Sequence, residues 1–348
     1  MRFRLLGNSG LKVSELCLGT MTFGESSGFG ADQAESRRMF DAYLAAGGNF
    51  IDTANIYSGG QSEQFLAEFI AAERSRLVLA TKYSMSTAAR DPNAGGNSRK
   101  NLQQSLEASL KRLRTDYVDL YWVHAWDAAT PLDELLRSLD DAVRAGKVLY
   151  VGFSNMPAWV VARAHTMAEL RSMSRCVALQ LHYSLVERNI ERELLPCAAA
   201  LGMAVTAWSP LAGGVLTGKY SRDPAERAKQ PGRLTTTGWG NLFLSERNFA
   251  IADVARTISA RIGKSATEVA LRWLLQRPGN VIPILGAKSA AQLAQQLSAA
   301  GFTLDADAIK ELDTVSRIDV GYPGSLLTGA VGKRMLHGEL VADIDGLA

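Results

Sequence analysis

Residues 101–123 read NLQQSLEASLKRLRTDYVDLYWV and contain one complete unit of the fold. Leu102, Leu106, Leu110 and Leu113 recur at spacings of three and four, which indicates the apolar face of a helix. The apolar run Val118–Val123 follows at once and predicts a buried strand. Helices that alternate with buried strands predict a parallel sheet with right-handed crossovers.

The same alternation runs along the whole chain. Expected strands cover residues 16–19, 50–52, 77–81, 118–123, 148–152, 177–181, 204–207 and 281–284. Eight such units close naturally into a barrel, whereas an open doubly wound sheet rarely needs that many. The sequence therefore predicts an α/β fold, a (β/α)8 TIM barrel, with residues 1–348 forming a single domain.

Three segments lie outside the repeat. Residues 2–6 and 11–13, joined by a Gly-rich turn, predict a β-hairpin, so that residues 1–14 cap the N-terminal mouth of the barrel. Residues 211–245 form a long loop after the seventh strand, and a loop of that length is usually a lid or a binding loop. Residues 304–348 predict one helix, over 305–316, and then a Gly-rich tail.

Composition and motifs exclude several classes of function. The 38 basic and 35 acidic side chains are interleaved, which indicates no nucleic-acid surface. No apolar run is long enough to cross a membrane and no secretory signal is present, so we expect a cytoplasmic protein. The cysteines and histidines show no metal-ligand spacing. Residues 213–219 resemble a P-loop, but Tyr220 stands where the Mg²⁺-binding Ser or Thr belongs.

Polar residues follow the second, third and fourth strands. Asp52, Lys82 and His124 each end one of them, and Tyr57 lies five residues beyond Asp52. Active sites of such barrels lie at the C-terminal ends of the strands, so these four side chains should converge. A tyrosine is a poor acid at neutral pH unless a neighbouring cation stabilises its phenolate. Lys82 would supply that cation and Asp52 would hold it, and His124 would either donate to a substrate carbonyl oxygen or complete the proton relay.

The residues at these strand ends resemble the motifs of the aldo-keto reductase superfamily. The motifs are Asp52-Thr53-Ala54-x-x-Tyr57, Ala80-Thr81-Lys82 and Asp119-Leu120-Tyr121-x-x-His124. The resemblance implies reversible NADPH-dependent reduction of an aldehyde or ketone to an alcohol, with Tyr57 as the proton donor. Around residues 122–126 and 150–159 the chain is similar to bacterial aryl-alcohol dehydrogenase-type members.

The resemblance also implies NADP(H) as the cofactor and a set of contacts to it. Ser154, Asn155 and Gln180 would hold the carboxamide, and Trp208 would stack on the nicotinamide. The pyrophosphate would contact Ser209, Leu211, Gly213 and Lys219 beneath the loop 211–245. Residues 282–289 resemble the signature that binds the adenosine end, where Ser289 caps a helix over 290–300, Lys288 suits a 2′-phosphate, and Gln292 and Gln296 reach the adenine. Further contacts are expected from Gly19, Thr20, Met21, Asp52, Pro210, Arg233 and Gly286.

A small-molecule carbonyl or alcohol, aryl or cyclic, is the expected substrate. The expected pocket consists of Met21, Phe23, Tyr57, Tyr83, His124 and Trp126, together with the tail after Tyr322. His182 either lines this pocket or has a structural role. The alternative function is a cofactor-sensing regulatory module of the ion-channel β-subunit type. The complete set of four catalytic residues, including His124, favours the enzyme.

Overall fold

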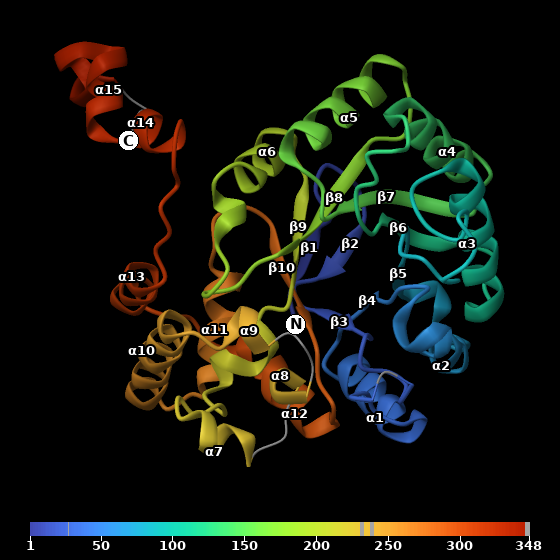
Figure 1. The fold of residues 1–348 in the computed structure, drawn as a ribbon, viewed down its shortest axis with the longest axis horizontal. Helices are drawn as coiled ribbons and strands as arrows, with labels where there is room; N and C mark the ends of the chain where they lie inside the picture. Colours follow the sequence, from blue (N-terminus) through green and yellow to red (C-terminus); the bar gives the residue numbers. More distant parts are fainter. Residues whose placement is uncertain (27, 230–232, 237–239, 345–348) are drawn as a thin grey trace.

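Eight parallel strands close into a barrel in the computed structural model, which describes residues 1–26, 28–229, 233–236 and 240–344. Around the barrel the strand order is β10-β3-β4-β5-β6-β7-β8-β9 (Figure 1). The strands are β3 (Cys17–Gly19), β4 (Phe50–Asp52), β5 (Val78–Tyr83), β6 (Val118–Val123), β7 (Val148–Ser154), β8 (Cys176–His182), β9 (Ala204–Trp208) and β10 (Val281–Leu285). The predicted (β/α)8 barrel is confirmed.

Helices surround the barrel and bury one face against it. They are α1 (Gln33–Ala45), α2 (Gln61–Ile70), α3 (Arg99–Leu113), α4 (Leu132–Arg144), α5 (Ala158–Leu170), α6 (Leu194–Ala200), α10 (Glu246–Ile262), α11 (Ala266–Leu275), α12 (Ala290–Leu297) and α13 (Ala306–Val315). Leu102, Leu106, Leu110 and Leu113 of α3 are all buried in the apolar layer between helices and strands. Short 3-10 turns add η1 (Tyr57–Gly60), η2 (Arg74–Arg76), η3 (Asn189–Glu191) and η5 (Ser298–Gly301).

An N-terminal β-hairpin closes the N-terminal end of the barrel. Strands β1 (Phe3–Leu5) and β2 (Lys12–Ser14) pair antiparallel, as the sequence predicts. Leu6 and Val13 are fully buried and belong to the same apolar cluster as Phe50 and Trp122 inside the barrel. At Gly7, with φ +58°, a Cβ would lie 2.2 Å from the carbonyl oxygen of Val177, so the hairpin turn requires glycine.

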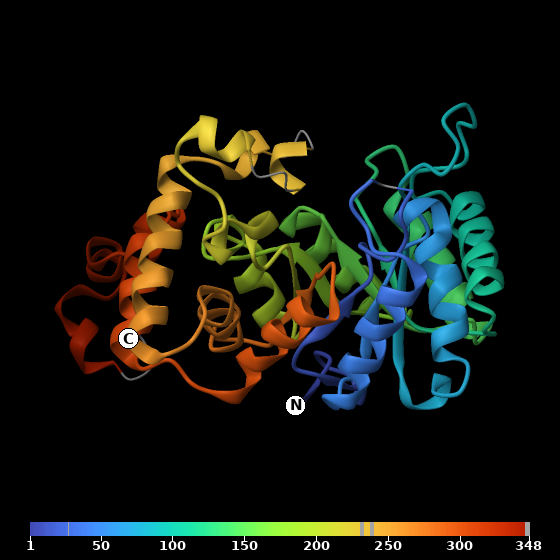
Figure 2. The same ribbon diagram turned by 90° about the horizontal axis from the view of Figure 1, so that it is seen from below.

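The segment after β9 contains helical turns. These are η4 (Ala212–Thr217), α7 (Pro224–Ala228), α8 (Arg233–Thr236) and α9 (Gly240–Phe243). Figure 2 shows this yellow segment at the same end of the barrel as the cyan loop that follows β5. It therefore lies at the C-terminal mouth, the end of the barrel where the sequence predicts the site.

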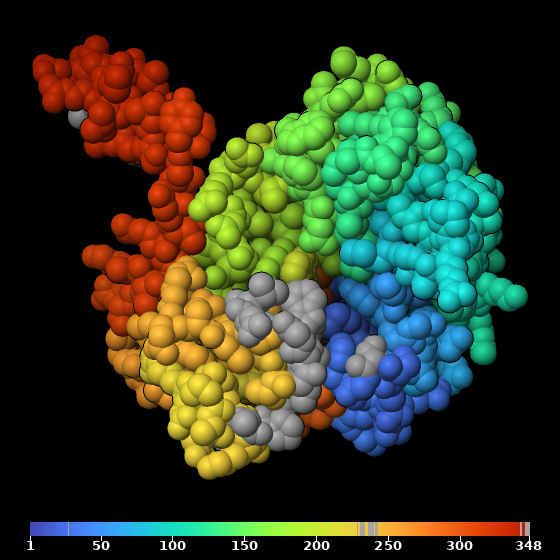
Figure 3. Space-filling model, viewed as in Figure 1, coloured from blue at the N-terminus to red at the C-terminus, as the bar shows by residue number. Residues whose placement is uncertain are grey.

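The C-terminal tail is helical and lies away from the barrel. After α13 the chain forms α14 (Gly324–Thr328), α15 (Ala330–His337) and η6 (Gly338–Asp343), which project beyond the barrel body (Figures 1 and 3). Tyr322 is 86% exposed at the start of this unit. The expectations of a Gly-rich tail without helices and of a tail lining the pocket were therefore wrong.

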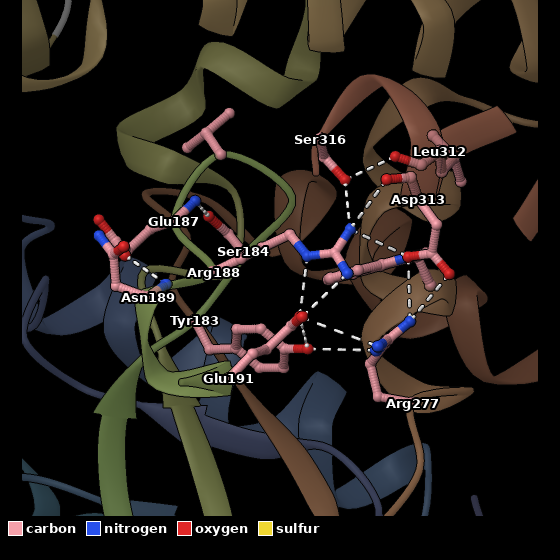
Figure 4. A network of polar contacts seen from close by, with 12 residues as sticks. Tyr183, Ser184, Glu187, Arg188, Asn189, Glu191, Arg277, Leu312, Asp313 and Ser316 are labelled. Carbon is pink, nitrogen blue, oxygen red and sulfur yellow. Dashed lines mark hydrogen bonds and ion pairs between the residues drawn. The ribbon is translucent and has the colours of Figure 1, made fainter. Parts of the chain in front are cut away.

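A network of ion pairs attaches α13 to the barrel (Figure 4). Arg188 is only 7% exposed. Its guanidinium pairs with Glu191 at 2.8 Å and with Asp313 of α13 at 3.0 Å. Arg277 also binds Asp313, and its Nε donates to the hydroxyl of Tyr183. Side chains from four parts of the chain are thus held together by mutual charge neutralisation.

The described residues include neither a membrane-spanning helix nor a cluster of metal-ligating side chains. No described helix is long and apolar enough to cross a membrane. No group of three or more His, Cys, Asp or Glu side chains in the described ranges is placed to hold a metal ion.

Candidate active site

Asp52, Lys82 and Tyr57 meet at the C-terminal mouth of the barrel. Asp52 ends β4 and Lys82 lies near the end of β5, and the Lys82 Nζ atom is 2.5 Å from Asp52 Oδ2. The same Nζ donates to the carbonyl oxygen of Thr53 at 2.7 Å and to Tyr57 Oη at 2.9 Å. The three protons of the ammonium thus have three partners, and the Lys82 side chain is fully buried.

The charge on Lys82 is the central electrostatic feature of the site. Burial lowers its pKa, but the contacts with Asp52 and Tyr57 outweigh burial, so the pKa is raised above the ordinary lysine value. Lys82 is therefore protonated at neutral pH. An ammonium in contact with a phenol oxygen favours the phenolate form, so this contact suits a phenol that gives up its proton.

His124 follows β6 and approaches Tyr57 edge-on. The two ring centroids are 6.2 Å apart with an interplanar angle of 84°. Burial, and then the charge of Lys82, lowers the pKa of His124 to about 3, so the imidazole is neutral at physiological pH. Its Nδ1 is buried without a partner among the described residues. An unpaired acceptor costs less than an unpaired N–H, which favours a proton on Nε2, available to a ligand.

The residues expected to hold a carboxamide form a continuous chain with these four. Gln180 Nε2 donates to Asp52 Oδ1 at 2.9 Å, and Ser154 Oγ donates to the carbonyl oxygen of Gln180 at 2.9 Å. Asn155 Nδ2 donates to Ser154 Oγ and to the carbonyl oxygen of His124 at 3.0 and 2.9 Å. The structure thus brings Ser154, Asn155 and Gln180 together beside the predicted catalytic set.

Trp208 ends β9 and stacks on a histidine. The rings of His182 and Trp208 are 4.1 Å apart and nearly parallel, and His182 meets Phe243 of α9 edge-on at 5.6 Å. His182 therefore packs between the indole and the segment after β9, which supports its structural role. Burial lowers the pKa of His182, so it packs as a neutral ring.

A tight turn follows Trp208 and contains the residues expected at the pyrophosphate. Ser209 has φ +53°, and Ala212, Gly213 and Gly214 of η4 have φ +50°, +64° and +99°. The Ala212 amide donates to the carbonyl oxygen of Ser209 and the Gly214 amide to that of Leu211, both at 2.9 Å, so these two amides have partners within the turn. Pro210 and Leu211 are buried beneath this turn, whereas Lys219 is exposed, with its ammonium 5.0 Å from the Tyr220 ring centroid. The side chain of Arg233 lies outside the described residues.

The expected adenosine end lies at the start of α12. Ser289 caps the helix by accepting from the Gln292 amide, as the sequence predicts. Gln292 Oε1 accepts from the Lys288 amide at 2.9 Å, and Gln296 Nε2 donates to the carbonyl oxygen of Gly286 at 2.8 Å. The predicted residues are therefore clustered, although both glutamines already bond to this turn.

Sequence reasoning missed one charged residue at this helix. Glu35 of α1 accepts from the Ala290 amide through Oε1 at 2.6 Å. The two residues are 255 positions apart, and Glu35 lies on a helix with no motif, so no signal in a single sequence links them.

The first barrel strand places three further predicted residues beside Asp52. Gly19 is opposite Asp52 in register, and a Cβ at Gly19 would lie 2.6 Å from Ile284 Cγ2. Thr20 is buried, with its Oγ1 3.2 Å from the carbonyl oxygen of Asp52, and Met21 is half-buried. All three lie at the mouth.

Two residues expected in the substrate pocket lie elsewhere. Phe23 is fully buried and packs edge-on against Phe69 of α2. Tyr83 is fully buried and stacks on Tyr121 in the outer apolar layer. Successive side chains of a strand point to opposite faces, so Tyr83 must point outward because Lys82 points inward. Trp126 remains half-buried near the mouth, with its amide donating to the carbonyl oxygen of Asn155.

Buried polar atoms without hydrogen-bond partners indicate that the site can hold a polar ligand such as a nicotinamide dinucleotide. Within the described ranges, Asn55 Oδ1, His124 Nδ1 and Trp208 Nε1 are buried and have no hydrogen-bond partner. Buried polar atoms are rarely left unpaired in folded proteins, and several at one mouth indicate a polar ligand there.

Comparisons with known proteins agree with this geometry. The family model described as "Aldo/keto reductase family" matches residues 15–317. An aryl-alcohol dehydrogenase of Pestalotiopsis microspora is 36% identical over 336 residues, which cover 94% of this chain and 85% of that protein. A norsolorinic acid reductase of Aspergillus flavus is 34% identical, with 93% and 83% covered. An uncharacterized oxidoreductase of Bacillus subtilis is 37% identical, with 90% and 96% covered.

Proposed function

The chain belongs to the aldo/keto reductase family, and we propose that it catalyses the reversible, NADPH-dependent reduction of an aldehyde or ketone to an alcohol. The observation that carries the proposal is the 2.9 Å contact between Lys82 Nζ and Tyr57 Oη. This contact gives a phenol at the mouth of the barrel the cationic neighbour that an acid needs near neutral pH.

Each of the four residues has a separate task in the reaction. The neutral His124 donates from Nε2 to the carbonyl oxygen of the substrate and fixes its position. Tyr57 gives its proton to the same oxygen, and Lys82 stabilises the phenolate that remains. Asp52, held by Gln180, keeps the ammonium oriented. A bound nicotinamide supplies the hydride for the carbonyl carbon, so that one proton and one hydride complete the alcohol.

The residues around the mouth would hold the dinucleotide in one orientation. Ser154, Asn155 and Gln180 would bind the carboxamide, and Trp208 would lie against the ring. The turn after β9 would bind the pyrophosphate, beneath the segment 211–245. At α12, Lys288 would attract a 2′-phosphate, which is the reason for proposing NADP(H).

An aryl or cyclic carbonyl is the proposed class of substrate. Met21 and Trp126 are half-buried apolar side chains that follow β3 and β6 at the mouth, which suits a planar apolar ligand. One relative of the chain is named as an aryl-alcohol dehydrogenase, which supports the same class.

The first prediction tests the proposed reaction directly. Consumption of NADPH with 4-nitrobenzaldehyde is measured at steady state for the wild type and for Tyr57→Phe. We expect turnover by the wild type and a roughly 10²- to 10⁴-fold lower kcat in the variant, since general acid catalysis contributes about that much. The Kd for NADPH should be unchanged, because the hydroxyl acts in the transition state.

Two outcomes would count against the enzyme. Tight NADPH binding by the wild type without turnover of any aldehyde, ketone or alcohol would favour the regulatory module. Equal losses of turnover and of NADPH affinity in Tyr57→Phe would contradict the role of the phenol.

A further inference from the structure

A carboxylate already occupies the start of α12, where the proposed function places the 2′ position of the cofactor. Glu35 lies in the first turn of α1, a helix that packs against α12. Its Oε1 accepts from the Ala290 amide at 2.6 Å, and its side chain is 21% exposed. An acidic side chain of the protein thus takes the place that an anionic ligand would favour.

The neighbouring amides at this helix start also have protein partners. The Lys288 amide donates to Gln292 Oε1 at 2.9 Å, and the Gln292 amide donates to Ser289 Oγ at 3.3 Å. Of the three amides at 288, 290 and 292, that of Ala290 is therefore the one whose hydrogen-bond acceptor comes from another helix. A 2′-phosphate that uses this amide must first displace Glu35.

The charge on Glu35 persists at neutral pH. The bond from the Ala290 amide, followed by the contact with Arg38, lowers the pKa of the carboxyl below its ordinary value. Glu35 Oε2 accepts from Arg38 Nε at 2.7 Å. Arg38 partly neutralises the negative charge near α12, but the Glu35 carboxylate still accepts the hydrogen bond from the Ala290 amide.

Space beside the same turn remains open. A Cβ built on Gly286 would meet no heavy atom within 4 Å, and Lys288 is exposed. The ammonium of Lys288 lies 5.9 Å from the Phe29 ring centroid, beside the same helix. A ligand at this turn would therefore contact a cation, Lys288, and an anion, Glu35.

We propose that Glu35 is a specificity-determining residue that limits the preference of this enzyme for NADP(H) over NAD(H). The inference rests on the proposed function. A 2′-hydroxyl, as in NADH, can donate a hydrogen bond to the carboxylate where it stands. A 2′-phosphate is repelled by the carboxylate and competes with it for the Ala290 amide, so part of the attraction of Lys288 is lost.

The test compares the binding of two dinucleotides by the full chain. The Kd values of NADPH and NADH are measured by quenching of tryptophan fluorescence for the wild type and for Glu35→Gln. The glutamine keeps an oxygen for the Ala290 amide and removes the charge, together with the oxygen that accepts from Arg38. We expect the Kd of NADPH to fall by roughly 2- to 5-fold, the size of a charge effect at an exposed helix start, and that of NADH to rise slightly, because its 2′-hydroxyl would donate to a neutral oxygen.

Two further variants separate a local effect from net charge. Asp41→Asn makes the same charge change on the outer side of α1, where Asp41 pairs with Arg37 at 2.9 Å. It should leave both Kd values unchanged. Lys288→Glu should weaken NADPH binding more than NADH binding. Thermal unfolding of each variant checks that the fold is intact.

The outcomes distinguish this inference from the proposed function. An unchanged ratio of the two Kd values in Glu35→Gln, or an equal gain in Asp41→Asn, would overturn the role of Glu35 and leave the reductase proposal standing. Failure of the wild type to bind either dinucleotide would overturn the proposed function, and this inference with it.

Discussion

Two ionic networks in this protein each contain a tyrosine, and they differ in the charges that face the phenol oxygen. At the mouth of the barrel, Lys82 donates to Tyr57 Oη at 2.9 Å, so the phenol oxygen faces a cation. In the network that attaches α13, Tyr183 donates to Glu191 Oε1 at 2.6 Å and accepts from Arg277 Nε at 3.1 Å. Tyr183 therefore contacts charges of both signs (Figure 4).

The difference lies in what happens to the tyrosine proton. Burial raises the pKa of Tyr183 well above the ordinary value; Arg277 opposes this and the bond to Glu191 adds to it. The proton of Tyr183 lies between two oxygens, whereas in the proposed reaction the proton of Tyr57 leaves a phenolate beside an ammonium. We infer that the arrangement of charges around a phenol, rather than their number, distinguishes the network proposed to be catalytic.

The largest expected effect comes from removing the cation of the first network. In Lys82→Met the phenolate of Tyr57 loses its stabilising charge, and we expect kcat to fall roughly 10²- to 10⁴-fold. The change also leaves Asp52 buried without its cation, which should lower the free energy of unfolding by about 3–5 kcal/mol. Steady-state kinetics and urea unfolding measure the two effects.

A double variant keeps this prediction testable if the single variant does not fold. Asp52→Asn combined with Lys82→Met removes both charges, so most of the lost stability should return while turnover stays low. Substantial turnover in the double variant would show that the contact between ammonium and phenol is not what distinguishes the two networks.

Disrupting the second network should lower the free energy of unfolding without changing catalysis. Arg188→Leu breaks contacts with Glu191, Asp313 and Ser316, and we expect the free energy of unfolding to fall by about 2–3 kcal/mol. Because this network contacts none of the four catalytic residues, kcat of the folded fraction should be unchanged. A large loss of kcat at full folding would remove the distinction between a structural and a catalytic network.

The smallest effect at neutral pH is expected from the neutral histidine of the first network, whose contribution changes only in acid. The pKa of His124 is lowered to about 3 in the folded protein, whereas the unfolded chain binds this proton near the ordinary value of 6.5. Its contribution to stability is complete above pH 6.5 and is lost as the pH falls towards 3. Between pH 6.5 and 3 the free energy of unfolding of the wild type should fall with pH more steeply than that of His124→Asn. The two slopes should differ by up to about 1.4 kcal/mol per pH unit. Identical slopes in the two proteins would contradict a neutral, buried imidazole.

Much of the fold and the central site could be predicted from local patterns. The strands β4 and β6 match their predicted bounds, because each is a short apolar run with clear limits. Asp52, Tyr57, Lys82 and His124 converge because parallel strands of a barrel end at one mouth. Ser289 caps α12, as its position before a helical run indicates.

The errors arose where tertiary packing decides. Strand β5 continues to Tyr83, two residues beyond its predicted end, and strand alternation then directs Tyr83 outward. Phe23 packs on a helix rather than at the mouth. In the tail, glycines at 324, 329, 332 and 338 obscured α14 and α15, since glycine is a poor helix former and interrupts the apolar pattern. Glu35 meets α12 only through the folded structure.

Three residues with left-handed backbone conformation have a consequence for engineering this scaffold. Ser84, Asn155 and Ser209 directly follow β5, β7 and β9, and have φ of +104°, +50° and +53°. They turn the chain sharply where the barrel ends and the variable loops begin. Libraries that graft or randomise these loops in search of new substrates should therefore start one residue later. A β-branched residue at position 84, 155 or 209 would disfavour this backbone conformation. It would therefore change the direction of the grafted loop and move the loop away from the mouth.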